Sequence, residues 1–182
     1  MTVETTDLRP GHRISRIIKG GWQLAAGHSA SVSPDPVADM LAFARQGIDT
    51  FDCADIYTGV ESLVGEFLAR NRAGADPIPV RVHTKYVPDL DRLPGLTRRD
   101  VERIIDRSLR RLGQERLDMV QFHWWDTGIP GYLQVAGWLQ ELQQAGSSIK
   151  AEVIGGFTTF LATMYIIVVN PSIISETGMP FS

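Results

Sequence analysis

Short apolar runs alternate with amphipathic segments along the first 146 residues, and this alternation leaves few folds open to the chain. Runs at 14–18, 48–51, 79–84 and 117–122 are expected as strands, and segments 37–45, 61–70, 97–112 and 132–144 as helices. Such alternation favours βα units and a parallel sheet. Right-handed crossovers then leave a doubly wound sheet or part of a (β/α)8 barrel, and periodicity alone does not choose between them.

The segment 97–112 gives the strongest helix signal. Thr97 is expected to cap its start and Gly113 to stop it, and its apolar residues form one stripe. Its arginines alternate with acidic residues, which is typical of a solvated face and not of a nucleic-acid patch.

Charge and cysteine content exclude several functional classes. The formal net charge is -3, and the 18 Lys and Arg residues are spread along the chain, so no nucleic-acid partner is indicated. The single cysteine, Cys53, excludes an intramolecular disulfide framework and favours a reducing, cytoplasmic compartment. The four histidines show no metal-ligand spacing, and the N-terminal residues lack the apolar core of a signal peptide. No dinucleotide-binding GxGxxG or P-loop motif is present.

Titratable residues stand where the expected strands end. Asp52 ends the second strand, Tyr57 follows five residues later, and Lys85 and His123 end the third and fourth strands. Barrel enzymes place their active sites at the carboxyl ends of their strands. A tyrosine hydroxyl is a poor proton donor at neutral pH, but an ammonium held nearby by a carboxylate assists it, and an imidazole can orient an incoming oxygen. The set suits protonation of a carbonyl oxygen while hydride reaches its carbon.

Each of these residues also has a purely structural interpretation. An aspartate after a strand often caps a turn, a lone tyrosine is usually half-buried packing, and a lysine at a strand end is usually solvated. A histidine beside Trp124 and Trp125 can be a hydrogen-bonded core residue. The catalytic hypothesis therefore depends on all four residues occurring together.

At these residues the sequence resembles the aldo-keto reductases, over about residues 14–146. The matching segments, in order, are Gly20-Gly21-Trp22-Gln23, FDCADIYTGVE, VHTKY and RSLRRLGQERLDMVQFHWWD. The resemblance implies a (β/α)8 barrel that reduces aldehydes and ketones with NADPH. For this chain, the resemblance favours part of a (β/α)8 barrel, with about four βα units, over a doubly wound sheet.

The resemblance also implies a role for each candidate residue. Tyr57 would be the general acid, Lys85 the ammonium that assists it, Asp52 the anchor of Lys85, and His123 the residue that orients the carbonyl. The implied cofactor-binding residues are Gly21, Trp22, Gln23 and Asp52. Trp124 and Trp125 would wall the substrate pocket or pack in the core, and no metal is implied.

The resemblance covers only part of a barrel, since a complete one needs about 250 residues. The family's later loops, which hold the pyrophosphate and the adenosine phosphate, have no counterpart among the matching segments. We therefore expect a truncated reductase with impaired activity and a small carbonyl substrate. Self-association of two half barrels would cover the open sheet edges.

The last part of the chain has a different character. From Val153 to Val169 it carries no charge, and a membrane-spanning helix takes about 17–25 such residues. The stretch KAEVIGGFTTFLATMYIIVVNPSIISETGMP resembles the start of xanthine/uracil permeases, where it forms the first membrane helix. We divide the chain into a reductase-like half barrel, 1–148, and a permease-like tail, 149–182, expected as one apolar helix with membrane contact.

Three functional hypotheses follow. The first is NADPH-dependent reduction of an aldehyde or ketone to an alcohol. The alternative from another class is a membrane-associated permease fragment fused to an inactive reductase half. The third is a module that binds the redox cofactor without catalysis. The abrupt change between Gly146 and Lys150 fits a natural fusion, a rearranged gene or an error in the sequence.

Overall fold

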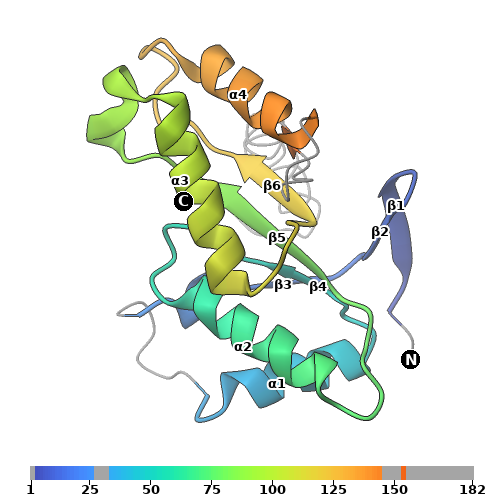
Figure 1. The fold of residues 1–182 in the computed structure, drawn as a ribbon. Coiled ribbons are helices and arrows are strands. Elements are labelled where there is room, and N and C mark those ends of the chain that lie inside the picture. Colours follow the sequence, from blue (N-terminus) through green and yellow to red (C-terminus); the bar gives the residue numbers. More distant parts are fainter. Residues whose placement is uncertain (1–2, 27–32, 145–152, 155–182) are drawn as a thin grey trace, which may run out of the picture.

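A parallel sheet with its helices between successive strands forms the centre of the molecule (Figure 1). The computed structural model describes residues 3–26, 33–144 and 153–154. The strands are β3 (Ile18–Gly20), β4 (Thr50–Asp52), β5 (Arg81–Tyr86), β6 (Met119–Phe122) and β7 (Val153–Ile154). The helices are α1 (Pro36–Arg45), α2 (Val60–Arg72), α3 (Arg98–Leu112) and α4 (Tyr132–Gln144). Short 3-10 helices, η1 (Trp22–Leu24) and η2 (Leu90–Gly95), complete the βα units.

Strand order decides between the two folds that periodicity left open. The five strands pair in chain order, β3-β4-β5-β6-β7, and every pair is parallel. A doubly wound sheet reverses its order at a switch point, whereas a barrel adds each strand beside the previous one. The described part of the chain is therefore an arc of a (β/α)8 barrel, as the resemblance implied.

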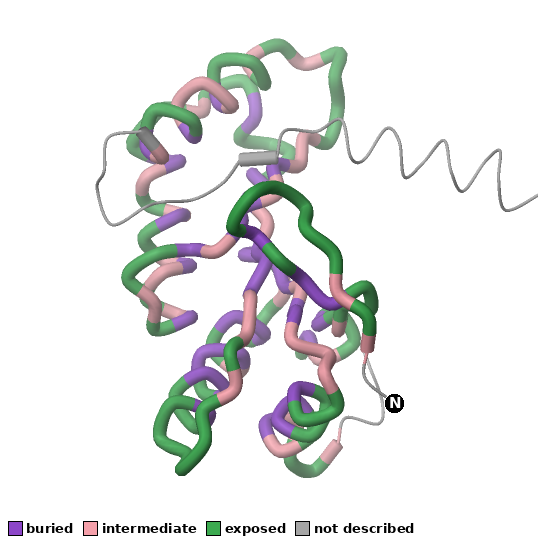
Figure 2. Tube along the Cα trace, turned by 90° about the vertical axis from the view of Figure 1, so that its right-hand side faces the viewer, coloured by how far each residue is buried: buried purple, intermediate pink, exposed green. Residues whose placement is uncertain are grey.

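The core lies between the sheet and its helices. In Figure 2 the buried parts of the tube follow the strands and the inward faces of the helices. Phe51 of β4 and Phe67 of α2 pack with ring centroids 4.6 Å apart. Gly65 lets α2 approach α3 closely, because a Cβ at this position would lie 2.2 Å from the backbone oxygen of Arg111.

Helix α3 begins and ends where the sequence predicted. The Thr97 side chain accepts a hydrogen bond from the Asp100 backbone N–H, and the Asp100 carboxylate accepts one from the Thr97 backbone N–H, which is a capping box. Gly113 ends the helix with φ +60°, a left-handed conformation that glycine adopts without strain.

The prediction of one strand over residues 14–18 is wrong. Its residues divide between β2 (His12–Ser15), which forms an antiparallel hairpin with β1 (Thr5–Arg9), and β3. Ser15 interrupts the run, since its backbone N–H donates to Asp49 Oδ1 at 2.9 Å and its hydroxyl donates to the Ile17 carbonyl at 2.7 Å. His12 Nε2 also lies 3.0 Å from His83 Nε2, so the hairpin contacts the amino-terminal side of the sheet.

The expected apolar tail helix begins differently in the structure. Val153 and Ile154 form β7, which pairs in parallel with Val120 and Gln121 of β6, because an edge strand offers its free backbone groups to any extended segment. Residues 155–169 of the expected helix lie outside the described residues. Among the helices that the structure describes, none has the length and apolar character needed to span a membrane.

Candidate active site

A cavity of about 480 Å³ opens at the carboxyl ends of β4, β5 and β6. Its volume lies within the range of about 300–1,000 Å³ that is usual for small-molecule sites. Its lining residues are Trp22, Ala54, Ile56, Tyr57, Lys85, Val87, Gln121, Phe122, His123 and Trp125. Three of the four predicted catalytic side chains therefore share one cavity.

Lys85 is held beside this cavity by Asp52, the last residue of β4. The Lys85 ammonium donates a hydrogen bond to Asp52 Oδ2 and another to the Cys53 carbonyl at 2.9 Å. The second carboxylate oxygen of Asp52 accepts a hydrogen bond from Gln121 Nε2 at 3.0 Å. Asp52 thus has both oxygens engaged and fixes the ammonium in place.

Tyr57 lies on the loop between β4 and α2, next to Lys85. Its backbone N–H donates to the Ala54 carbonyl at 3.1 Å, and its carbonyl accepts from the Val60 N–H at 3.0 Å. The Lys85 ammonium lies 5.3 Å from the centre of the Tyr57 ring. A tight turn therefore brings the phenol to the anchored cation.

His123 directly follows β6 and is half-buried in the cavity wall. Its backbone N–H donates to the Tyr86 carbonyl at 3.0 Å, and its ring meets Trp125 edge to face with centroids 4.7 Å apart. Its Nε2 is buried and has no hydrogen-bond partner among the described residues. Desolvation lowers the pKa of His123, so the imidazole is neutral at pH 7. This nitrogen is available to a polar atom of a ligand.

The predicted cofactor-binding residues differ in how they meet the cavity. Gly21 donates its backbone N–H to the Asp52 carbonyl at 2.8 Å, and a Cβ there would lie 3.0 Å from that oxygen, so Gly21 allows a close backbone approach. Trp22 lines the cavity and is half-exposed. Gln23 is exposed and does not line it.

Of the two tryptophans after His123, one walls the cavity and the other packs against the core. Trp125 lines the cavity, and its indole N–H donates to the Pro88 carbonyl at 2.7 Å. Trp124 instead donates to the Ile129 carbonyl at 3.1 Å and packs against Phe122 with ring centroids 5.8 Å apart.

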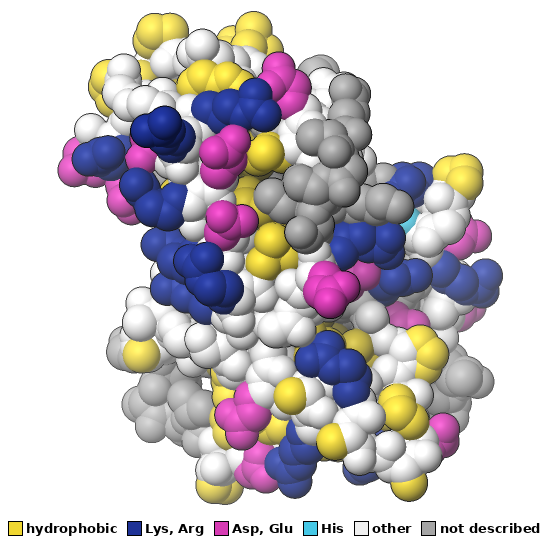
Figure 3. Space-filling view, viewed as in Figure 1, with side chains coloured by type: hydrophobic (Ala, Val, Ile, Leu, Met, Phe, Trp, Pro, Cys, Tyr) yellow, Lys and Arg dark blue, Asp and Glu magenta, His cyan; other side chains and the backbone are white. Residues whose placement is uncertain are grey.

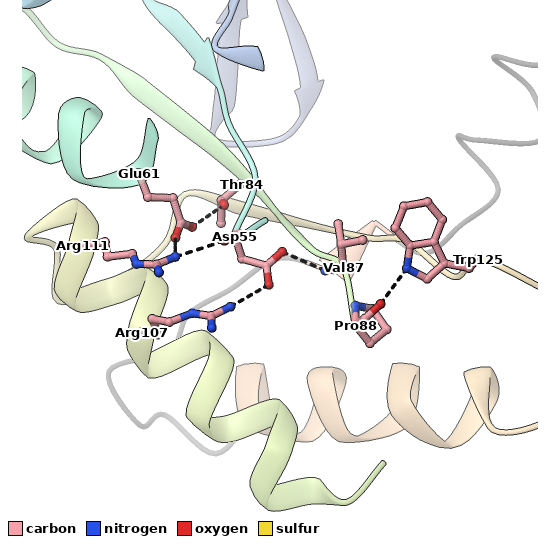
Figure 4. Close-up of polar contacts among 8 residues, drawn as sticks. All are labelled: Asp55, Glu61, Thr84, Val87, Pro88, Arg107, Arg111 and Trp125. Atoms are coloured by element: carbon pink, nitrogen blue, oxygen red, sulfur yellow. Dashed lines mark hydrogen bonds and ion pairs between the residues drawn. The ribbon is translucent and has the colours of Figure 1, made fainter. Parts of the chain in front are cut away.

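Sequence reasoning missed a buried ionic network behind the cavity (Figure 4). Arg107 of α3 donates to Asp55 Oδ2 at 3.1 Å, and Arg111 donates to Glu61 Oε2 at 3.3 Å, while both carboxylates are buried. Glu61 also accepts from the Thr84 hydroxyl at 2.7 Å. The solvated face predicted for α3 is therefore incomplete at these two arginines, because their side chains stay 40% and 37% exposed while their guanidinium groups bind buried carboxylates. Their i, i+4 spacing and the additional acids in FDCADIYTGVE were the available signals.

Gln121 was the other missed residue. It is the polar position in the apolar run of β6, two residues before His123, and it faces the cavity with it. A polar side chain in a buried strand needs a partner, and Asp52 is that partner.

Part of the chain is similar to nucleobase permeases. It is 50% identical over 40 residues to the guanine/hypoxanthine permease PbuO of Bacillus subtilis, which is 22% of this chain and 9% of that permease. It is 48% identical over 42 residues to the adenine permease AdeP of Escherichia coli, 23% of this chain and 9% of that protein. These short matches fit the permease-like tail.

The fold is shared with solved aldo-keto reductases. A putative aldo-keto reductase from Pseudomonas aeruginosa matches with 22% identity and a TM-score of 0.61, over 83% of this chain and 60% of that one. An aldo-keto reductase from the silkworm Bombyx mori, solved in complex with NADP, matches with 22% identity and a TM-score of 0.63, over 84% of this chain and 50% of that one. The chain thus spans about half of the length of such structures.

The family model described as "Aldo/keto reductase family" matches residues 16–158, well over half of the 182 residues. The match includes every cavity residue and β7, and so extends beyond residue 146, where the resemblance seen in the sequence ended. With the barrel arc and this match together, the chain belongs to the aldo/keto reductase family.

Proposed function

We propose that residues 1–148 carry the proton-donating part of an NADPH-dependent reductase that converts an aldehyde or ketone to an alcohol in the cytoplasm. The observation that carries this proposal is the cavity that Tyr57, Lys85 and His123 line together, with Lys85 anchored by Asp52. The family match and the NADP complex of the silkworm relative support the choice of cofactor.

Carbonyl reduction adds a hydride to the carbon and a proton to the oxygen. Tyr57 donates the proton from its hydroxyl, and the Lys85 ammonium stabilises the negative charge that remains on the phenol oxygen. The neutral His123 imidazole, whose Nε2 has no partner in the part of the chain that the structure describes, orients the carbonyl oxygen. Asp52 and Gln121 keep Lys85 from moving when that charge develops.

The cavity wall fits the nicotinamide end of the cofactor. Trp22 offers a half-exposed planar ring in the cavity that Tyr57 also lines, and Gly21 keeps the first loop against β4. Trp22 and Tyr57 would hold the nicotinamide, which supplies the hydride when bound. The remaining wall is largely apolar, with Ile56, Val87 and Trp125, which favours a carbonyl substrate with an apolar body.

The test is oxidation of NADPH by the full chain with a panel of aldehydes and ketones. Tyr57→Phe should lower turnover at least about 100-fold, since a positioned acid contributes about 10²–10⁴-fold. Tyr132→Phe is the matched control, because Tyr132 is an exposed tyrosine on α4 outside the cavity and should leave turnover unchanged. Full turnover by Tyr57→Phe would contradict the acid assignment, and NADPH binding without any turnover would favour a noncatalytic module.

We propose further that activity is weaker than in relatives of full barrel length. In the described part of the chain, β3 and β7 each pair on one side only, and the chain covers about half of its solved relatives. Pairing with a second copy would cover these edges.

The permease similarity supports a second candidate, membrane attachment through the tail 149–182. A full chain that stays with lipid vesicles after a carbonate wash would support it, and a chain that washes off would not span the membrane through this tail. No transport is proposed, since transport sites form between several helices.

A further inference from the structure

Asp55 stands in the turn that joins Asp52 to Tyr57, and four hydrogen bonds hold it. Its backbone N–H donates to the Lys85 carbonyl at 3.1 Å, and its side-chain Oδ1 accepts from the Val87 N–H at 3.0 Å. Two arginines of α3 reach the same residue. Arg107 Nη2 donates to Asp55 Oδ2 at 3.1 Å, and Arg111 Nη1 donates to the Asp55 carbonyl at 3.0 Å.

The first two of these bonds lie on either side of Tyr86, the residue that follows Lys85. One goes to Lys85 itself and the other to Val87, two residues further on. Asp55 therefore attaches its loop to the part of β5 that carries the ammonium. Tyr57 follows after two residues, within a turn closed by its bond to the Ala54 carbonyl. A displacement of Asp55 would move Tyr57 relative to Lys85.

Burial of the Asp55 carboxylate opposes folding, because the charged group loses its hydration. The Asp55 side chain is 1% exposed, and desolvation raises its pKa to about 7, against the opposing effects of the Val87 N–H and Arg107. Glu61, which is also buried, raises the pKa further. Apolar residues of similar volume are often at least as stabilising as a buried ion pair, so stability alone is a weak reason for this one.

We propose that Asp55 is a positioning residue that sets where the Tyr57 hydroxyl stands relative to the Lys85 ammonium. Arg107 of α3 donates to Oδ2 of this carboxylate, while Oδ1 accepts from the N–H of Val87, the residue directly after β5 (Figure 4). The inference rests on the function proposed above, because Tyr57 and Lys85 have their chemical roles only in that reaction.

Asp118, the residue before β6, provides a matched control, because it binds the opposite end of β5. Its Oδ2 accepts from the Val82 N–H at 2.9 Å, and its Oδ1 pairs with Arg81 at 3.1 Å. This is the same arrangement of carboxylate, backbone N–H and arginine, but it lies at the start of β5 and outside the cavity. A merely structural role for Asp55 predicts equal behaviour of Asp55→Asn and Asp118→Asn.

The first measurement is independent of turnover. The full chain is labelled with ¹³C at tyrosine Cζ, and Tyr57→Phe identifies the Tyr57 signal among the four tyrosines. Asp55→Asn should shift the Tyr57 signal, because the phenol changes its place in the field of Lys85, and Asp118→Asn should leave it unchanged. An unchanged Tyr57 signal in folded Asp55→Asn would overturn the proposal.

The second measurement separates chemistry from binding. Asp55→Asn should lower kcat by about 10–100-fold, since a misplacement of about 1 Å can cost about 100-fold, and should leave the NADPH dissociation constant within about twofold. Asp118→Asn should leave kcat within about twofold. A wild-type chain without turnover would refute the proposed function, while the Tyr57 signal would still decide whether Asp55 positions the phenol.

A second variant keeps the test decisive if Asp55→Asn does not fold. The Arg107 side chain is 40% exposed, so Arg107→Gln releases Asp55 Oδ2 without a change in the loop, and it should shift the Tyr57 signal in the same direction. Arg107→Lys, which restores a cation, should return the signal towards its wild-type position. Two folded Arg107 variants with the wild-type signal would contradict the role of the ion pair.

Discussion

Replacement of Gly65 by alanine should destabilise the protein, although alanine is the better helix former. Gly65 lies inside α2, and the added Cβ would be 2.2 Å from the backbone oxygen of Arg111 and 3.2 Å from the carbonyl carbon of Leu112. Ordinary van der Waals contacts begin at about 3.4 Å. The two helices would therefore have to separate by about 1 Å, since a backbone oxygen cannot rotate away.

The magnitude follows from two opposing effects. Alanine gains about 1 kcal/mol over glycine in a helix interior, while overpacking of a close contact costs about 1–3 kcal/mol and occasionally more. Because the contact is with backbone, we expect the upper part of that range and a net loss of about 2 kcal/mol. Such a loss is a large fraction of the stability of a typical domain, about 5–15 kcal/mol.

The assay is urea unfolding of the full chain, with Gly137→Ala as the control. Gly137 lies in the interior of α4, and a Cβ there would meet no atom within 4 Å. The control should raise the free energy of unfolding by about 0.5–1 kcal/mol, so the same substitution should have opposite signs in two helices. Equal or greater stability of Gly65→Ala would refute the close contact between α2 and α3.

Two further predictions concern a helix cap and the contact of the hairpin with the sheet. Thr97→Ala should lower stability in urea unfolding by about 1 kcal/mol, through loss of the cap of α3, and an unchanged midpoint would contradict the capping box. Burial and the neighbouring His12 lower the pKa of His83 to about 4, so the stability from His83 is fully present above about pH 6.5 and is lost as pH falls towards 4. His83→Gln should flatten this dependence in thermal unfolding, whereas an unchanged slope would refute it.

The regular part of the fold could be predicted because its periodicity is local. Helix α4 has the predicted bounds, and Asp52 ends its strand as expected, since each depends on a few neighbouring residues. The hairpin of β1 and β2 gave no such signal, because β1 is largely exposed and polar. It is held instead by contacts such as that of His12 with His83, 71 residues away.

The side chains that line the cavity could be predicted from the sequence, but the ion pairs behind them could not. Tyr57, Lys85 and His123 lie at or just beyond the carboxyl ends of their strands, so their common location follows from the parallel sheet. Arg107 and Arg111 look like surface residues in the sequence, and Figure 3 shows Lys and Arg side chains gathered over α3. Only the fold places buried carboxylates from 52 and 50 residues earlier behind them.

The backbone and the side chain of Val87 have separate tasks in this site. Its N–H belongs to the bonds that hold Asp55, while its side chain belongs to the cavity wall. Main-chain bonds do not depend on the side chain that is present, and Ile56 in the same wall is 42% exposed. Selection or engineering can therefore vary the side chains at these two positions to change which ligand the cavity admits, while the bonds that hold Asp55 remain.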